Sequence, residues 1–152
     1  MTLSWTCPIS LQPPLLALAI HQSRYTHDLL VRSDECVLNI PGRPLGDYVM
    51  QFGSRSGADF DKLADSQLAL ESGRRVSAAW ISRCLAHIEC SVIDRFSPGD
   101  HSLFVAQVVG AWAESEAFDV SWQIQGQQED LAPMTHLGGN LFGLLGSSVT
   151  LK

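Results

Sequence analysis

The sequence predicts a mainly β protein, a β-barrel core with flanking helices, on three observations. Apolar runs of strand length recur along the chain from residue 15 onward. Short stretches with helix start and stop signals separate the first of these runs. A tight turn joins the two longest runs into an antiparallel hairpin. The sequence contains neither a G-x-G-x-x-G pattern nor a P-loop, so nothing in it supports a doubly wound dinucleotide-binding fold.

Composition limits the organisation of the chain and its class of partner. The chain has 152 residues, 45% of them hydrophobic and 17% charged, which fits a single domain over 1–152 with one core. Its net charge of -6 argues against non-specific nucleic-acid binding, which needs clustered Lys and Arg. Its apolar runs are shorter than the roughly 18 residues of a transmembrane helix, and its start does not match a signal peptide. We therefore expect a cytoplasmic protein that binds neither nucleic acid nor membranes.

The stretch SWTCPISLQPP, residues 4–14, is rich in proline. Because Pro8, Pro13 and Pro14 lack a backbone donor and fix φ, the stretch is excluded from a helix interior or a central strand. We expect a shaped loop. Such a loop either lines a site or is an irregular connection in which Trp5 fills the core.

Strands and short helices alternate in the next part of the chain. LLALAIH, residues 15–21, is nearly continuously apolar and predicts a strand covered on both faces. SRYTHDLLVRS, residues 23–33, predicts a short helix with Ser23 or Thr26 as its N-cap. ECVLNIP, residues 35–41, predicts a second strand.

The middle of the chain predicts a helix followed by a loop. PLGDYVMQFG, residues 44–53, has proline near its start and glycine at its end, as helices often do. Residues 54–66 predict a loop with one helical turn at 60–64. Residues 114–133 are polar and weakly patterned, and we assign no structure to them.

A long hairpin is predicted next. LAHIECSVIDRF, residues 85–96, alternates like a half-buried strand, with Pro98 and Gly99 in the turn and residues 102–114 as the return strand. The predicted core face holds Ala86, Ile88, Cys90 and Val92, and the predicted outer face holds His87, Glu89 and Ser91.

Cysteines and histidines give no metal or disulfide signal. The four cysteines, at positions 7, 36, 84 and 90, are scattered without a C-x-x-C pattern, so we expect reduced core thiols. His21, His27 and His87 are not at ligand spacing with an acid or a cysteine cluster. We therefore predict no metal site.

Six segments occur in series along the chain: SWTCPISLQPPLLALAI, SRYTHDLL, ECVLNIP, FGSRSGADFDKL, AHIECSVIDRFSPGDHSLFVAQVV and HLGGNLFG. In this order they resemble the flavin reductase-like, FMN-binding split-barrel family, which includes flavoredoxins and short-chain flavin reductases. The resemblance runs from about Ser4 to Gly143. It implies a six-stranded antiparallel barrel with flanking helices that works as a homodimer, with FMN, or FAD as an alternative, near the subunit interface.

The resemblance also implies an activity. NADH or NADPH would reduce the flavin, and a monooxygenase is a further candidate partner. Hydride transfer between two stacked rings needs no catalytic acid or base, so we predict no catalytic side chain. A non-catalytic flavin-binding module, or a degenerate dimeric scaffold, is the alternative. Family members usually carry a further strand before the SWTC loop; its apparent lack here would leave a sheet edge for another element to cover.

Ten residues are the expected cofactor contacts by this resemblance. The flavin ring and ribityl chain would lie against the N-terminal loop, the phosphate against the segments SRYT and SGADFDK, and the flavin or nicotinamide near GDH. The alternatives to a cofactor contact are a surface charge for Arg24 and Lys62, a helix cap for Thr26 and a turn-forming role for His101. For His136, a binding role and a structural role are weighed evenly. The ten residues are Ser4, Trp5, Thr6, Ser10, Arg24, Thr26, Ser56, Gly57, Lys62 and His101.

Overall fold

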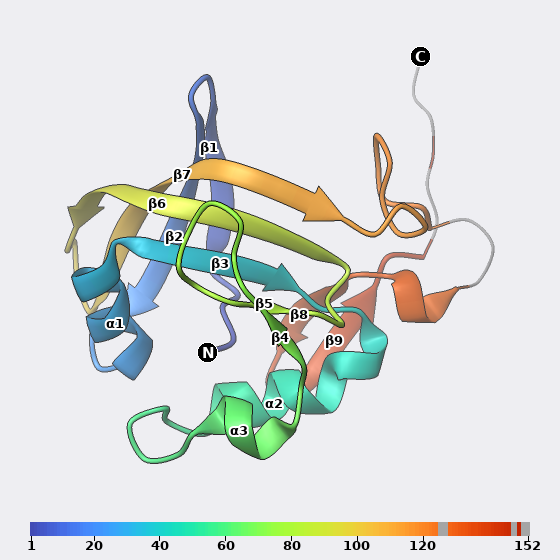
Figure 1. The fold of residues 1–152 in the computed structure, drawn as a ribbon, viewed down its shortest axis with the longest axis horizontal. Coiled ribbons are helices and arrows are strands. Elements are labelled where there is room, and N and C mark those ends of the chain that lie inside the picture. The colour runs from blue at the N-terminus through green and yellow to red at the C-terminus, as the bar shows by residue number, and fades with distance from the viewer. Residues whose placement is uncertain (125–127, 147–148, 150–152) are drawn as a thin grey trace.

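Five antiparallel strands form the main sheet of the computed structural model, which describes residues 1–124, 128–146 and 149. Their order across the sheet is β1-β2-β7-β6-β3 (Figure 1). β1 and β3 are therefore the edges of this sheet. The five strands span Thr6–Leu11 (β1), Pro14–His21 (β2), Glu35–Ile40 (β3), Ala86–Phe96 (β6) and His101–Ala113 (β7).

Helices and two small strand pairs lie around this sheet. Figure 1 shows α2, α3 and the β8–β9 pair on one side of it, with α1 at one end. With 42% strand and 20% helix, the predicted mainly β fold with flanking helices is confirmed. These elements are Tyr25–Ser33 (α1), Arg43–Leu45 (η1), Gly46–Ser54 (α2), Lys62–Ser66 (α3), Leu70–Glu71 (β4), Trp80–Ile81 (β5), Glu129–Leu131 (η2), Met134–Gly138 (β8) and Leu141–Leu144 (β9).

The predicted strands and helices before residue 114 are present within two residues of their expected bounds. The helical turn expected at 60–64 is α3, whose N-cap Asp61 accepts a hydrogen bond from the Ala64 N–H at 3.1 Å. The main core lies between β2, α1, β6 and β7. Its fully buried members include Leu18, Ile20, Leu30, Cys90 and Phe104.

The proline-rich stretch forms an edge strand rather than a loop. β1 pairs with β2 on one side only, so Pro8 is tolerated there, and the register shifts between Pro8 and Ser10. Trp5, just before β1, is 64% exposed. The prediction of a loop over residues 6–11 is therefore wrong, and so is the alternative in which Trp5 fills the core.

The start of α1 differs from the prediction. Arg24 is the N-cap, no side chain caps the helix, and Thr26 lies inside the first turn. Ser23 instead contacts the ring of His21, with Oγ 2.8 Å from Nδ1 and the backbone N–H donating to the same atom. The prediction that Ser23 or Thr26 caps the helix is therefore wrong. The Ser23 hydroxyl contacts His21 instead, and Thr26 already lies inside the helix.

β6 is covered on both faces over its first half. His87 and Glu89, predicted to face outward, are buried, and Glu89 is fully so. A bulge between Glu89 and Cys90 interrupts the simple alternation. Trp80 of β5 stacks on the His87 ring with centroids 4.4 Å apart and covers the outer face. The prediction of a half-buried strand is therefore wrong for this part of β6, because β5 and the loop before it cover the face that was expected to be exposed.

All four cysteines are free thiols. Cys84 and Cys90 are buried and Cys36 is partly buried, whereas Cys7 is exposed on β1. The prediction of core thiols is therefore wrong for Cys7, because the edge strand turns it outward. Among the described residues, the helices are too short and too polar for any of them to cross a bilayer.

Candidate functional site

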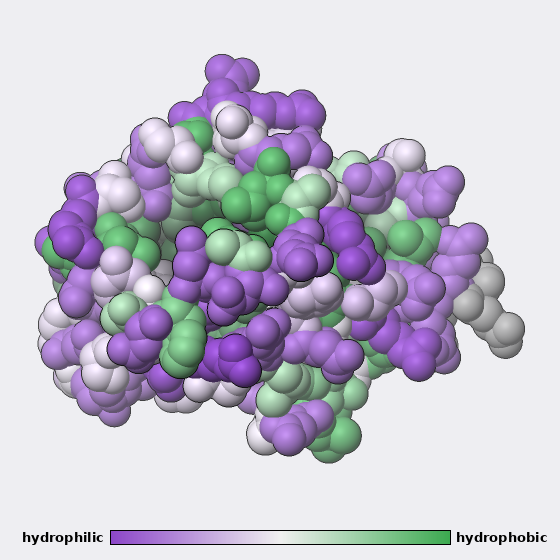
Figure 2. All heavy atoms as spheres, turned by 60° about the horizontal axis from the view of Figure 1, so that its bottom comes forward, coloured by the Kyte–Doolittle hydropathy of each residue, from purple (hydrophilic) through white to green (hydrophobic). Residues whose placement is uncertain are grey.

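A cavity of about 980 Å³ lies between the N-terminal residues, β3, α2, α3 and the β8–β9 pair. Thr2 ties the N-terminal residues to α2, because its hydroxyl donates to the Val49 carbonyl at 2.6 Å. Figure 2 views the molecule from the α2 and α3 side, where apolar side chains reach the surface in patches between polar ones. The cavity is lined mostly by apolar groups, including Leu3, Leu38, Ile40, Tyr48, Phe52 and Phe60.

Polar groups enter the cavity at a few fixed points. Ser4 Oγ lies 3.1 Å from His136 Nδ1, and the other ring nitrogen of His136 donates to the Gly139 carbonyl at 3.1 Å. Asn39 Oδ1 accepts from the Ile81 N–H and contacts His87 Nδ1 at 2.8 Å. The histidine of HLGG thus anchors the β8–β9 pair to the N-terminal segment. Hydrogen bonds therefore fix both Ser4 and Asn39 in the lining of the cavity.

A small pocket of about 80 Å³ adjoins the cavity. Three cationic side chains line it, those of Arg24, Arg55 and Lys62, together with the hydroxyl of Thr26. The two hollows share Met1, Thr2, Tyr25, Thr26 and Lys62. Among the described residues that line the small pocket there is no Asp or Glu. The site therefore joins an apolar chamber to a basic one.

The charges in the small pocket are not compensated from within it. Lys62 Nζ donates to the Phe52 carbonyl at 2.8 Å. Burial and the neighbouring charge of Arg24 lower the pKa of Lys62 below its ordinary value. A bound anion would relieve this repulsion. The pocket also lies where α1 begins without a side-chain cap, and the positive end of a helix favours an anion.

Gly57 brings the loop before α3 close to α1. A Cβ at this position would meet Tyr25 Cδ1 at 3.2 Å and Lys62 Cε at 3.7 Å. The contact with the tyrosine ring is tighter than most side chains tolerate. A residue without a side chain therefore lets the loop pack closely against Tyr25 and Lys62, beside the small pocket.

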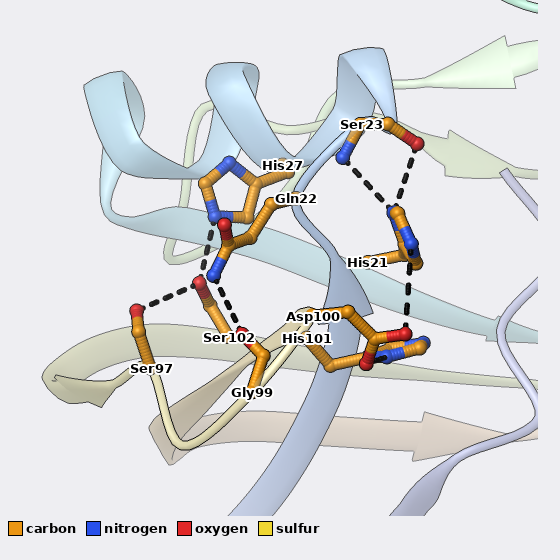
Figure 3. A network of polar contacts seen from close by, with 9 residues as sticks. All are labelled: His21, Gln22, Ser23, His27, Ser97, Gly99, Asp100, His101 and Ser102. Atoms are coloured by element: carbon orange, nitrogen blue, oxygen red, sulfur yellow. Dashed lines mark hydrogen bonds and ion pairs between the residues drawn. The ribbon is translucent and has the colours of Figure 1, made fainter.

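A second cluster of predicted residues lies on the sheet surface. Trp5 stacks on His101 with ring centroids 4.7 Å apart and planes at 28°. His101 Nδ1 lies 2.7 Å from Asp100 Oδ1, and His21 Nε2 lies 3.8 Å from the other oxygen (Figure 3). The hydrogen bond from His101 lowers the pKa of Asp100. This aromatic and imidazole surface is separate from the residues that line the two hollows.

The structure thus divides the ten expected contacts. Ser4, Thr6 and Gly57 line the cavity, Arg24 lines the small pocket, and Thr26 and Lys62 line both. Trp5 and His101 form the stacked pair. Ser10 in β1 and Ser56 before α3 line neither hollow, and Ser56 Oγ accepts from the Ala58 N–H.

Arg55 and Tyr25 are pocket residues that sequence reasoning missed. The Arg55 guanidinium lies 5.7 Å from the Phe60 ring centroid, which holds it over the loop. A signal was present, because Arg55 directly precedes the segment SGADFDK, which was expected at the phosphate. Tyr25 lies inside the segment SRYT that was expected at the phosphate, but only the start of α1 shows that the residue lines the pocket.

Ser102, His27 and Asp28 have the residue types and the order of contacts of a hydrolytic triad. Ser102 Oγ lies 2.9 Å from His27 Nε2 (Figure 3). On the other side of the ring, His27 Nδ1 lies 3.3 Å from Asp28 Oδ1. Ser102 is only 2% exposed and also contacts Ser97 Oγ at 3.1 Å. A substrate carbonyl has no access to this hydroxyl. The contacts join α1 to the β6–β7 hairpin.

A buried polar cluster surrounds Glu89. Its carboxylate accepts hydrogen bonds from the N–H groups of Arg74 and Arg75 at 2.7 and 2.6 Å and from the Trp80 indole at 2.6 Å. Burial alone would raise the pKa of Glu89, but these hydrogen bonds outweigh it and hold the pKa below its ordinary value. The Arg74 guanidinium lies over the rings of Trp80 and Trp112. The cluster fixes the loop before β5.

The fold and the paired hollows define a class: a mainly β barrel-type domain with room for a ligand that is apolar at one end and anionic at the other. Within that class, the chain belongs to the family of the flavin reductase like domain, whose model matches residues 1–142. The predicted family is confirmed.

Relatives of known sequence span several organisms. An uncharacterized protein of Archaeoglobus fulgidus is 38% identical over 109 residues, which cover 72% of this chain and 62% of that protein. The match therefore covers less than two thirds of that relative. The Escherichia coli protein YddH is 27% identical over 99% of this chain and 80% of its own length. An NADH-dependent FAD reductase of Streptomyces globisporus is 26% identical over 73% of this chain and 60% of that protein.

Solved structures show the same fold. An FMN-binding domain of a flavin reductases-like enzyme from Shewanella baltica superposes with a TM-score of 0.89, at 24% identity, over 99% of this chain and 80% of that one. The flavoredoxin of Desulfovibrio vulgaris gives a TM-score of 0.85 at 18% identity, over 98% and 79% of the two chains. These similarities confirm the fold class.

Proposed function

We propose that this protein binds FMN and transfers reducing equivalents from NADH or NADPH to flavin. The observation that carries the proposal is the junction of the large apolar cavity with the basic pocket of Arg24, Arg55 and Lys62. A flavin mononucleotide has a flat, largely apolar ring system at one end and a phosphate at the other. The residues present therefore fit this group, and FMN fits better than FAD because the basic pocket is small.

The chain's own residues would do three things. Arg24, Arg55 and Lys62 would hold the phosphate by charge-assisted hydrogen bonds, with Thr26 adding a hydroxyl. The apolar lining would hold the ring and exclude water. Ser4 and His136 would keep the N-terminal segment against it. The bound flavin would supply the hydride acceptor, which needs no protein acid or base.

The reductant and partners follow from the family by analogy. The Streptomyces relative is an NADH-dependent FAD reductase. A Rhodococcus opacus relative, 30% identical over 66% of this chain and 51% of that protein, is the reductase component of a nitrophenol monooxygenase. We propose a nicotinamide as reductant and a monooxygenase as a candidate partner. We propose the cytoplasm as the compartment of this activity, because NADH and NADPH are supplied there.

We also propose a homodimer of a single domain. The expected domain is 1–152, and residues 125–127, 147–148 and 150–152 lie outside the described part. β1 presents Ile9 and Leu11 at 50% and 88% exposure on its protruding hairpin (Figure 1). Exposed apolar side chains on an edge strand favour pairing with another copy. The mass in solution tests this.

The experiment separates enzyme, carrier and scaffold. The purified chain is reconstituted with FMN and its visible spectrum is recorded after gel filtration. Oxidation of NADH and of NADPH is then followed at 340 nm with added FMN. Retained flavin with nicotinamide oxidation supports the proposal. Retained flavin without oxidation indicates a non-catalytic flavin-binding module, and no retained flavin indicates a scaffold.

A further inference from the structure

Two of the four cysteines face each other across adjacent strands. Cys36 of β3 and Cys90 of β6 are register partners in the antiparallel ladder. This ladder runs without a register shift from the pair Glu35 and Ser91 to the pair Ile40 and Ala86. The bulge beside Cys90 affects only the pairing of β6 with β7.

The geometry of the pair suits a covalent link. Directly opposite residues in an antiparallel ladder have side chains on the same face and Cα atoms about 4.5 to 5.5 Å apart. A disulfide requires a Cα separation of about 4.4 to 6.8 Å. The other two thiols lie elsewhere, Cys7 on the exposed edge strand and Cys84 in a separate cluster with Leu45 and Leu68. The ladder therefore selects one pair among the four cysteines.

The two thiols differ in access and in acidity. Cys90 is fully buried in the main core, whereas Cys36 is partly exposed. Hydrogen bonding with Cys90 lowers the pKa of Cys36, although burial opposes the shift. The same interaction and burial raise the pKa of Cys90. A small oxidant thus meets first the thiol that ionises more readily.

The geometry points to Cys36 and Cys90 as a reversible dithiol that a hydroperoxide converts to an intramolecular disulfide. The Cys36 thiolate attacks one oxygen of hydrogen peroxide, giving a sulfenic acid and hydroxide. The Cys90 sulfur then displaces hydroxide from the Cys36 sulfur and loses its proton. Two thiols and one peroxide give one disulfide and two waters. The reaction needs no flavin, so it is independent of the proposed function.

The link would act on the wall of the cavity. β3 continues from Cys36 directly into Val37, Leu38, Asn39 and Ile40, which all line the cavity. A bond to Cys90 would fasten this strand to the central part of the sheet. The oxidised chain would therefore open less readily along the β3–β6 ladder.

The experiment uses the full chain. Purified protein is treated with equimolar hydrogen peroxide, the reaction is stopped with catalase, and thiols are blocked with N-ethylmaleimide in denaturant. We expect loss of two hydrogens and two maleimide adducts in place of four. A tryptic species should join the Cys36 peptide to the peptide 84–95, in which fragmentation should find the maleimide on Cys84 and the disulfide on Cys90. Dithiothreitol should restore four adducts. Exchange of the β3 amides with solvent deuterium should slow in the oxidised protein.

Matched variants keep the result falsifiable. The double variant Cys7→Ala, Cys84→Ala keeps the pair and should still lose two hydrogens. In Cys90→Ala, which cannot close the disulfide, dimedone should label Cys36 and not Cys7. The inference is overturned if the treated wild type keeps four reactive thiols, if peroxide links only Cys7 between chains, or if Cys36 passes to the sulfinic acid without a cross-link.

Discussion

Lys62 and Arg24 enter one small pocket from different elements, and the charge of Arg24 contributes to the lowered pKa of Lys62. Lys62 comes from the first residue of α3 and Arg24 from the N-cap of α1. Two positive groups held together within a folded chain repel each other unless an anion lies between them. The proximity of these two positive charges is the electrostatic reason to expect a phosphate in this pocket.

Arg24→Ala should weaken FMN binding roughly ten- to a hundredfold, because a charge-assisted hydrogen bond contributes on the order of 1.5–3 kcal/mol. Riboflavin lacks the phosphate, so its affinity should change little. Titration of intrinsic flavin fluorescence with each ligand measures both. Arg32→Ala, in the last turn of the same helix, is the control and should leave both affinities unchanged. An equal loss for FMN and riboflavin would show that Arg24 contacts the ring or supports the fold.

Thr26→Val should weaken FMN binding less than Arg24→Ala does, because the backbone N–H donors at the start of α1 remain. The same titration measures this difference.

Arg24→Ala should also change the acidity of Lys62. Without the Arg24 charge, the pKa of Lys62 should rise toward its ordinary value. NMR titration of the Lys62 side chain measures the shift. In the wild type the folded-state pKa lies below the unfolded value, so unfolding takes up a proton between the two and this contribution to stability rises with pH. That interval should narrow in Arg24→Ala. A Lys62 titration curve that is the same in both proteins would contradict the proximity of the two charges.

Glu89→Gln should destabilise the fold. The amide keeps one acceptor oxygen for the three N–H donors of Arg74, Arg75 and Trp80, and each buried donor left unpaired costs about 1–3 kcal/mol. Because the pKa of Glu89 is lowered on folding, its contribution is present above the unfolded value of about 4.3 and is lost as pH falls below it. Urea denaturation at pH 7 and between pH 5 and 3 measures both effects.

Glu35→Gln is the matched control for that loop. Glu35 is partly buried, and it accepts a solvent-exposed hydrogen bond from the Ser77 N–H at 2.9 Å. Its substitution should cost much less than Glu89→Gln at pH 7. Similar losses in the two variants would mean that the buried carboxylate does not hold the loop.

Cys84 should make stability fall at alkaline pH. Burial raises the pKa of Cys84 to about 12 in the folded chain. An unfolded thiol ionises near pH 8.5, so the contribution is intact below that pH and is lost progressively from there to the folded pKa, by about 2 kcal/mol at pH 10. Cys84→Ala should flatten the decline in unfolding free energy between pH 8 and 10, whatever its effect at pH 7. Cys7→Ala is the control for removal of an exposed thiol. An unchanged decline in Cys84→Ala would contradict this account.

Local patterns predicted the strands and helices well because each element carries its own period or its own stop signals. The run 15–21 and the hairpin over 85–114 depend on short-range alternation and turn residues, which the sequence displays directly. The burial of His87 and Glu89 depends instead on Trp80, which covers them from another part of the chain. Such coverage is a tertiary effect and leaves no local period.

The residues of the candidate site also divide into those that a sequence segment predicted and those that only the fold brings to the site. Arg24, Thr26 and Lys62 were expected from the resemblance, and the fold brings them to one pocket. Arg55 and Tyr25 complete that pocket through the path of the loop and the start of α1. Ser10 lies away from both hollows, because β1 continues outward along the sheet edge.

The strand order has a kinetic consequence. β6 and β7 are joined by a short turn, so their pairing closes a small loop at low entropic cost. β2 pairs with β7 across α1, β3, α2 and α3, which closes a much longer loop. Because contact order sets folding speed, we expect the central hairpin to assemble first and the docking of β2 to limit the rate. A nascent chain would therefore hold the β1–β2 hairpin without its β7 partner until residues 101–113 have been synthesised.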